Sequence, residues 1–275
     1  MKPAPTTRTW TRYVAIGDSL TEGMTDPDPG MPGAYVGWAD RLAVELAARA
    51  DAEDKEFGYA NLAIRGRLLA DVVGPQLDAA LALGPDLVSI IGGANDILRP
   101  KADVDALAAD LEAAVARIRA TGADVLMATP ADPYKAPLLR AFRGRCALYV
   151  ACIWSIAQRQ GAFVLDQWGQ PFLRDWSMWA DDRLHMNSEG HQRVSLAALS
   201  SLGIETDEEA WRTPPPPAQA VPRREAAVAN ARWAKDHVGP WVQRRLRHES
   251  SGDHVSAKRP LVTPLHARRA DRTID

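Results

Sequence analysis

Five short apolar runs, separated by segments with helical periodicity, constrain the fold of this chain more than any other feature. The runs are rich in Val, Ile, Leu and aromatic residues, and each reads as a buried strand: residues 12–17, 57–64, 86–91, 124–129 and 162–166. Between two of them, Val104, Leu111 and Ile118 fall on one face of a helix. Strands that alternate with helices predict a parallel sheet covered on both faces, because each helical crossover returns the chain to the same edge. The sequence therefore predicts a three-layer α/β/α sandwich around a five-stranded parallel sheet.

The chain divides into two parts of opposite charge at the proline run Pro214–Pro217. Residues 223–275 contain 12 Lys and Arg against 6 Asp and Glu, a net charge of +6, whereas residues 1–222 carry a net charge of −8. The acidic main part argues against nucleic-acid binding, which depends on Lys and Arg that neutralise phosphates. We therefore predict a main domain over residues 1–204, a Pro-rich linker over 205–222, and a basic tail beyond it that is helical and disordered.

The basic tail has a helical segment with an apolar side. Trp233, Trp241, Val242 and Leu246 share that side, whereas residues from about Glu249 onward have the composition of a disordered end. The apolar side predicts docking, and two kinds of surface compete for it. One is the acidic main part of the same chain, and the other is an external partner or an anionic surface.

Membrane-spanning and disulfide-stabilised classes of protein do not fit the sequence. No apolar run reaches the ~18 residues of a membrane-spanning helix, and the N-terminal residues lack the uninterrupted apolar stretch of a secretory signal. Cys146 and Cys152 are too few for a disulfide framework, and no second cysteine cluster suggests structural zinc. We therefore expect a cytoplasmic protein without a transmembrane segment.

Candidate chemical groups lie in the loops that follow the predicted strands, because α/β sheets gather functional residues at the carboxyl ends of their strands. Ser19 follows the first strand within Gly17–Gly23, so its hydroxyl would be held rigidly at the edge of the sheet, as a nucleophile requires. The alternative for a serine at this place is that it caps the following helix.

A serine nucleophile needs a base, and His185 is the histidine best placed to provide one. It lies in the last core loop, before a predicted helix in which His191 is expected to be partly exposed and structural. Asp182, three residues earlier, could bond one ring nitrogen and direct the other towards Ser19. Asp181 is a rival for that role, and spacing alone does not decide between the two aspartates.

Acyl transfer builds negative charge on an oxygen in the transition state, and hydrogen-bond donors must be in place to stabilise it. Three groups could donate: the backbone N–H of Ser19, the backbone N–H of Gly66, and the side-chain amide of Asn95. Each also has a simpler interpretation. Gly66 fits an ordinary turn, and Asn95 fits a helix cap.

Taken together, these segments resemble the SGNH hydrolases, the GDSL-type esterase and lipase family. The resemblance covers roughly residues 12–202, with Gly17–Gly23, Gly66, Gly93–Asp96 and Asp182–His185 matching the four family blocks in order. It implies a flavodoxin-like sheet in strand order 2-1-3-4-5, Ser19 as nucleophile, His185 as base, Asp182 rather than Asp181 as its orienter, and Ser19, Gly66 and Asn95 as the oxyanion hole. Met186 departs from the pattern, because many members have Pro there.

The resemblance implies a serine esterase that hydrolyses carboxylic esters, either short-chain or acetyl esters, through an acyl-serine intermediate. No metal or cofactor is required, and the sequence lacks the zinc-protease, P-loop and dinucleotide-binding patterns. The expected partner is a small-molecule ester, although the same machinery would also serve a thioester or an amide. The alternative is an interaction protein whose basic, Trp-containing tail binds an anionic surface or a partner, with the hydrolase core secondary.

Four tryptophans lie in or beside the predicted loops: Trp38, Trp168, Trp176 and Trp179. Their aromatic faces could bind acyl or sugar groups of a substrate. They could equally belong to the core, because large aromatic side chains mainly bury apolar area.

Overall fold

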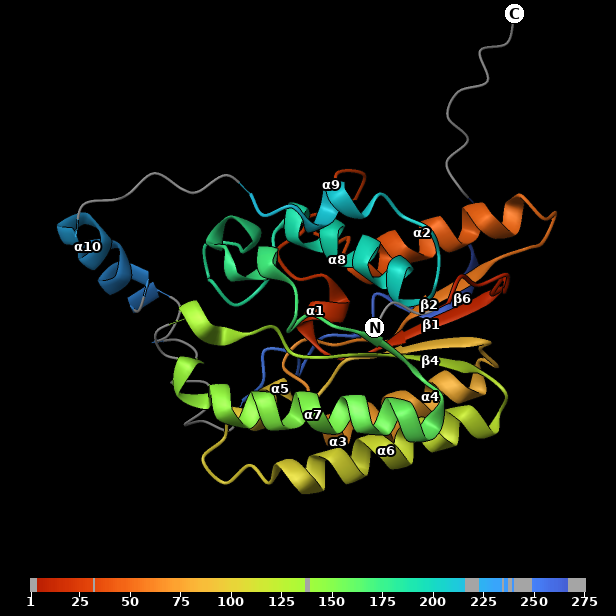
Figure 1. The fold of residues 1–275 in the computed structure, drawn as a ribbon, viewed down its shortest axis with the longest axis horizontal. Coiled ribbons are helices and arrows are strands. Elements are labelled where there is room, and N and C mark those ends of the chain that lie inside the picture. Colours follow the sequence, from red (N-terminus) through yellow and green to blue (C-terminus); the bar gives the residue numbers. More distant parts are fainter. Residues whose placement is uncertain are drawn as a thin grey trace, which may run out of the picture.

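The computed structural model describes residues 4–31, 33–136, 139–215, 223–233, 235–236, 239 and 249–266. Its centre is a six-stranded sheet in the order β5-β4-β3-β1-β2-β6 (Figure 1). The parallel strands are β1 (Arg12–Ile16), β2 (Gly58–Asn61), β3 (Leu87–Ile90), β4 (Asp124–Ala128) and β5 (Phe163–Leu165). Their order confirms the expected 2-1-3-4-5 arrangement, and the sheet has one strand more than predicted.

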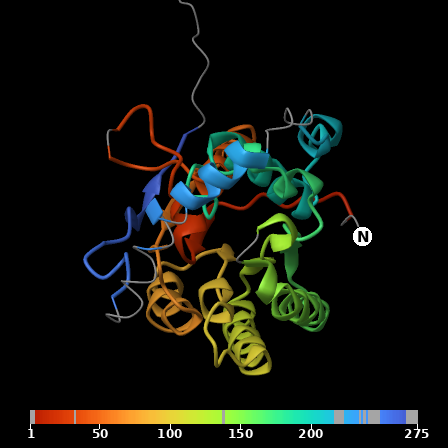
Figure 2. The ribbon, with the colours of Figure 1, turned by 90° about the vertical axis from the view of Figure 1, so that its left-hand side faces the viewer.

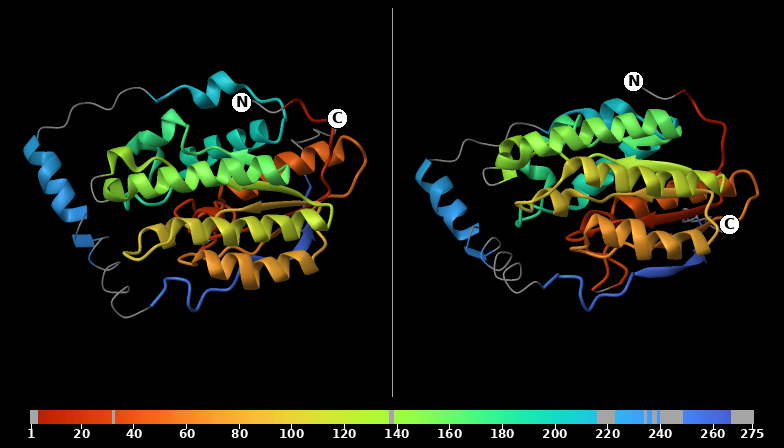
Figure 3. Two further views of the ribbon diagram at one scale, coloured as in Figure 1. Left: turned by 60° about the horizontal axis from the view of Figure 1, so that its bottom comes forward. Right: turned by 90° about the horizontal axis from the view of Figure 1, so that it is seen from below.

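Helices cover both faces of this sheet, as the alternating pattern predicts. One face carries α2 (Trp38–Asp51) and α8 (Ser188–Ser201), and the other carries α6 (Val104–Ala120) and α7 (Arg143–Gln160) (Figure 1). The pairs α2 with α8 and α6 with α7 are in contact, and Figure 3 shows α6 and α7 side by side. The molecule therefore has the three predicted layers.

Each layer of helices encloses its own apolar core. Successive residues of a strand point to opposite faces, so Tyr13 and Ala15 enter the core beside α2 and α8, whereas Val14 and Ile16 enter the core beside α6 and α7. The predicted apolar face of α6 is buried, and the Asp103 side chain caps its first turn by accepting two backbone N–H bonds.

The remaining elements are short. They are α1 (Ser19–Glu22), α3 (Leu69–Asp71), the π-helical turn η1 (Val72–Gln76), α4 (Leu77–Ala82), α5 (Ala94–Ile97), α9 (Glu208–Arg212), α10 (Arg223–Trp233), and the 3-10 turns η2 (Pro133–Lys135), η3 (Leu139–Phe142), η4 (Pro171–Arg174) and η5 (Trp176–Met178). Among the helices that the structure describes, none combines the length and the apolar character needed to span a bilayer.

The sixth strand, β6 (Arg259–Pro264), corrects one expectation. The sequence predicts disorder from about Glu249, but over 249–266 the chain is ordered, and β6 pairs antiparallel with β2. This strand is held by backbone hydrogen bonds to β2, and its side chains are largely exposed. Its sequence therefore lacks the apolar pattern by which the other strands were predicted. Residues 216–222 of the predicted linker and the positions of Trp241, Val242 and Leu246 lie outside the described residues. The bounds of the three predicted segments stay predictions.

Candidate active site

Strand β1 delivers Ser19 to the carboxyl edge of the sheet. Gly17 turns the chain there with φ +153°, and a Cβ at this position would approach both Ile91 O and Thr21 Oγ1 to 2.7 Å. Asp18 is the N-cap of α1, because its side chain accepts the backbone N–H of Leu20 at 3.1 Å. The capping role is therefore filled by Asp18, which leaves the Ser19 hydroxyl available for another partner.

That partner is His185, which stands 166 residues later in the sequence and which the fold brings next to Ser19. The Nε2 atom of His185 lies 2.9 Å from Ser19 Oγ, and its Nδ1 atom lies 2.6 Å from Asp182 Oδ2. The other oxygen of Asp182 accepts the backbone N–H of His185 at 3.0 Å. Asp181 is exposed to solvent. The three predicted side chains thus form one continuous hydrogen-bonded chain.

The protonation state of Asp182 suits this arrangement. Burial by itself raises the pKa of the carboxyl, but the hydrogen bond and charge of His185, together with two backbone N–H groups, outweigh it and lower the pKa below its ordinary value. The ionised carboxylate accepts a hydrogen bond from Nδ1–H. With Nδ1 held by this carboxylate, the other ring nitrogen, Nε2, faces the hydroxyl of Ser19.

A second carboxyl stands directly beside the serine. Asp18 is 2% exposed, and burial raises its pKa to about 6, although the Leu20 N–H and His185 act in the opposite direction. The raised pKa means that this carboxyl gains and loses its proton in a weakly acidic range.

The structure also brings Asn95 to the turn that contains Gly66. The Asn95 side-chain Nδ2 donates to the carbonyl oxygen of Arg67 at 3.0 Å, and Asp96 accepts the backbone N–H of Leu69 at 2.9 Å. Gly66 has φ +72°, a left-handed conformation that favours glycine. The N-cap of α5 is Gly93, so Asn95 is not the helix cap that the sequence left open.

Two groups that the sequence analysis missed support the Gly66 turn. Glu22, at the end of α1 and 4% exposed, accepts the backbone N–H of Arg65 at 2.7 Å and also pairs with its guanidinium. The hydrogen bond and charge of Glu22 raise the pKa of Arg65, whose guanidinium lies 5.2 Å from the centre of the Tyr35 ring. Sequence carries no signal for this pair, because its members stand 43 residues apart.

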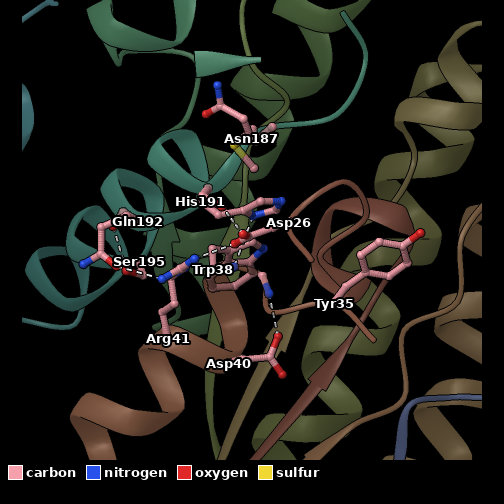
Figure 4. A network of polar contacts seen from close by, with 12 residues as sticks. Asp26, Tyr35, Trp38, Asp40, Arg41, Asn187, His191, Gln192 and Ser195 are labelled. Atoms are coloured by element: carbon pink, nitrogen blue, oxygen red, sulfur yellow. Dashed lines mark hydrogen bonds and ion pairs between the residues drawn. The ribbon is translucent and has the colours of Figure 1, made fainter. Parts of the chain in front are cut away.

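A buried polar network ties the loop over residues 24–37 to α8, which begins just after the His185 turn (Figure 4). Asp26 pairs with Arg41 at 2.6 Å between Oδ2 and Nη2, and it accepts a hydrogen bond from Ser188. The ring Nδ1 of His191 accepts the backbone N–H of Trp38 at 3.1 Å. His191 is fully buried rather than partly exposed, and burial lowers its pKa to about 4, so the ring is neutral.

An apolar pocket of about 140 Å³ lies next to Ser19, Asn95 and His185. Its walls include Leu20, Ala94 and Leu184, which are the sequence neighbours of Ser19, Asn95 and His185. Of the four tryptophans noted above, Trp176 and Trp179 line this pocket, whereas Trp38 belongs to the core with no exposed surface.

Charged residues also line this pocket, among them Asp132 and Arg174. Asp132, 6% exposed, pairs with Arg143 at 2.7 Å and with Arg174 at 2.8 Å. Burial opposes ionisation of Asp132, but the two arginines outweigh it and keep the pKa of this carboxyl below its ordinary value. The pocket therefore offers an apolar wall for one part of a ligand and charged groups for another.

Comparison with known proteins places the chain in a wider context. Residues 15–193 match the model of the GDSL-like lipase/acylhydrolase family. No curated protein sequence matches that of the chain.

Solved structures of similar fold include three hydrolases. LAE5, an alpha/beta hydrolase enzyme from the metagenome of Lake Arreo, Spain, is 24% identical with a TM-score of 0.58, over 71% of this chain and 97% of that one. The acetylxylan esterase Axe2 from Geobacillus stearothermophilus is 20% identical with a TM-score of 0.56, over 78% and 99%. The esterase EstA from Pseudoalteromonas sp. is 21% identical with a TM-score of 0.54, over 70% and 96%. These likenesses show a shared fold.

Proposed function

Since this chain belongs to the GDSL-like lipase/acylhydrolase family and is an ester-hydrolysing enzyme, we propose that it is a serine esterase that acts through Ser19, His185 and Asp182. One observation carries the proposal: His185 joins the hydroxyl of Ser19, at 2.9 Å, to the carboxylate of Asp182, at 2.6 Å. A hydroxyl becomes an effective nucleophile when an oriented imidazole accepts its proton.

The first half of the reaction acylates the serine. Ser19 Oγ attacks the carbonyl carbon of the ester, and its proton passes to Nε2 of His185. The carbonyl oxygen becomes an oxyanion, which accepts hydrogen bonds from the Ser19 N–H, the Gly66 N–H and the Asn95 amide. When the C–O bond of the ester breaks, His185 gives its proton to the oxygen of the leaving alcohol, and the acyl group stays on Ser19.

The second half releases the acid. A water molecule attacks the acyl-serine carbonyl while His185 accepts its proton, and the same three donors stabilise the second oxyanion. The bond to Ser19 Oγ then breaks, and His185 returns the proton to that oxygen. The product is a carboxylic acid, and the serine is free again.

The apolar pocket supports short-chain or acetyl esters as substrates. Its volume of about 140 Å³ is close to that of an apolar cavity of ~150 Å³ known to hold one benzene molecule. A space of this size fits an acyl chain of up to about six carbons. Asp132 and Arg174, which pair with each other and also line the pocket, suit a polar alcohol group.

Hydrolysis of para-nitrophenyl esters from acetate to decanoate tests the proposal. We expect Ser19→Ala and His185→Ala to lower kcat by about 10⁴-fold or more, and wild-type kcat/KM to fall for chains longer than hexanoate. Ser155→Ala removes an exposed hydroxyl that donates to the main-chain oxygen of Ala151 within α7, and it should retain full activity. Turnover by Ser19→Ala at the wild-type rate would refute the serine mechanism, and a best substrate of eight carbons or longer would refute the short-chain assignment.

A further inference from the structure

The C-terminal extension, which lies beyond the residues that match the family, returns to the end of the molecule that carries Ser19. Figure 2 faces that end and shows α10 nearest the viewer. Figure 3 shows α10 at one end of the molecule and β6 along the border of the sheet. Its described residues contact two turns of the proposed active site, one on each side.

On the first side, α10 contacts the turn of Asp182. The indole N–H of Trp233 donates to the main-chain oxygen of Asp182 at 2.8 Å. Arg183 donates to the side chain of Asn230 at 2.6 Å, and its guanidinium lies 5.2 Å from the centre of the Trp233 ring. Arg183 has φ +55°, a left-handed conformation that a residue with a side chain rarely adopts without support. Of the two docking surfaces expected for the tail, Trp233 therefore uses the one on its own chain.

On the second side, residues 250–252 pack against the Gly66 turn. Ser250 Oγ donates to the carbonyl oxygen of Gly66 at 3.2 Å. Gly252 is buried directly against the carbonyl oxygen of Arg65, so close that a Cβ at this position would overlap that oxygen. The extension thus contacts both peptide groups that flank the Gly66 Cα.

These contacts determine the direction of the N–H of Gly66. The carbonyl oxygen of Arg65 and the N–H of Gly66 belong to one trans peptide, so they point in opposite directions. Because the oxygen faces Gly252, the N–H faces away from the extension. A rotated peptide would instead place a carbonyl oxygen where the proposed mechanism needs a donor, and would repel the developing oxyanion.

Lys258 anchors the extension beside this contact. Its ammonium group donates to the main-chain oxygens of Glu22 at 2.6 Å and Tyr35 at 3.0 Å, and to the carboxylate of Asp40 at 2.6 Å. Glu22 is the last residue of α1 and also holds Arg65. The extension is therefore bonded to the nucleophile helix as well as to the Gly66 turn.

We propose that the C-terminal extension is a positioning part of the active site, in which Ser250 and Gly252 orient the Arg65–Gly66 peptide and Trp233 holds the Asp182 turn. The inference rests on the proposed roles of Ser19, Asp182 and Gly66. Its physical basis is that catalytic groups must be placed before the reaction, and that a shift of about 1 Å can cost about 100-fold in rate.

Three variants of the full chain test the inference: Gly252→Ala, which pushes on the Arg65 carbonyl, Ser250→Ala, and Trp233→Phe, which removes the indole donor and keeps a smaller aromatic ring. We expect Gly252→Ala to lower kcat by about tenfold to 100-fold, and the other two by about threefold to tenfold, with KM changed by less than about threefold. Ser250→Thr, which keeps a hydroxyl, should restore the wild-type kcat. Thr263→Ala removes a hydroxyl that bonds Arg259 within β6, and it should leave kcat unchanged.

The outcomes separate this inference from the proposed function. Ser19→Ala with wild-type activity would refute the serine mechanism itself. If Ser19→Ala is inactive but Ser250→Ala, Gly252→Ala and Trp233→Phe stay within about twofold of wild type in kcat, only the positioning role is refuted. A fall in kcat that Thr263→Ala shares would also refute it, because the effect would then reflect general stability. If kcat falls only in Trp233→Phe, the role of Ser250 and Gly252 at the Gly66 turn is refuted. If it falls only in the Ser250 and Gly252 variants, the role of Trp233 at the Asp182 turn is refuted.

Discussion

Asp182 holds His185 with both oxygens of its carboxylate. One oxygen lies 2.6 Å from the ring Nδ1, and the other accepts the backbone N–H of the same histidine at 3.0 Å. The aspartate therefore fixes the backbone of His185 and also favours a proton on Nδ1 of its ring. An asparagine can reproduce only the first of these effects, because its amide has one acceptor oxygen and one donor nitrogen.

Asp182→Asn is accordingly expected to fold and to lose activity. With the amide oxygen on the backbone N–H, the NH₂ group faces Nδ1 and makes this nitrogen an acceptor, so the ring proton moves to Nε2. That nitrogen then cannot accept the proton of Ser19, and we expect kcat to fall by about 10⁴-fold. Steady-state kinetics with a para-nitrophenyl ester measure the effect. Asp181→Asn is the matched control, and an equal loss in that exposed variant would contradict the assignment.

Asp18 should make the stability depend on pH in a weakly acidic range. Its pKa in the folded protein, about 6, lies above the ordinary value of ~3.9 in the unfolded chain. The stabilisation is therefore fully present below pH ~4 and is lost as the pH rises through about 6, up to about 3 kcal/mol in the free energy of unfolding.

Asp18→Asn isolates this contribution, because asparagine keeps an acceptor for the Leu20 N–H but does not ionise. Urea unfolding of both proteins at pH 4, 5, 6 and 7 measures it. We expect the wild type to lose stability relative to the variant as the pH rises. Parallel curves for the two proteins would show that the Asp18 carboxyl does not titrate in this range.

The ion pair between Arg41 and Asp26 should matter far more to stability than an exposed pair. Asp26 is 1% exposed in its side chain, so Arg41→Ala leaves a buried carboxylate without its cation. We expect a loss of about 3 kcal/mol in the free energy of unfolding. Arg117→Ala breaks the pair with Asp78, whose side chains are 50% and 64% exposed, and should cost less than about 1 kcal/mol. Equal losses in urea unfolding would contradict this difference.

Filling the apolar pocket should shift the preference towards shorter acyl groups. Ala136 lines the pocket, and Ala136→Leu adds three carbon atoms to its wall. We expect the ratio of kcat/KM for butyrate over acetate to fall about tenfold, since one methylene in an apolar pocket is worth ~1–3 kcal/mol. Ala151→Leu, on the exposed side of α7, is the control. An unchanged ratio in Ala136→Leu would show that the acyl chain lies elsewhere.

The sequence predicted those parts of the fold that depend on local apolar patterns. Tyr13 and Val14 lie in a run that is apolar on both faces of the sheet, which is the signature of a central parallel strand. Strand β6 has no such signature, because its hydrogen bonds join its backbone to β2 and its side chains are largely exposed. A strand of this kind is visible only once its partner strand is in place.

The candidate site divides in the same way. Ser19, Asp182 and His185 were predicted because they stand in short motifs after predicted strands, and the structure brings them together. The sequence indicated that Trp233 docks on a surface, but it did not identify its acceptor or those of Lys258, because these acceptors lie 51 and up to 236 residues away along the chain. Trp233 and Lys258 belong to no motif, so only the tertiary fold identifies the groups to which they donate.

Strand β6 also affects whether the edge of the sheet can pair with a strand of another molecule. Without it, β2 would present a row of unpaired backbone N–H and C=O groups, which a strand from another chain could join. β6 covers that row and contains Pro260 and Pro264, which have no N–H to offer a further strand. The extension therefore covers this edge of the sheet with a strand to which a further strand pairs poorly, which protects the enzyme against edge-to-edge aggregation.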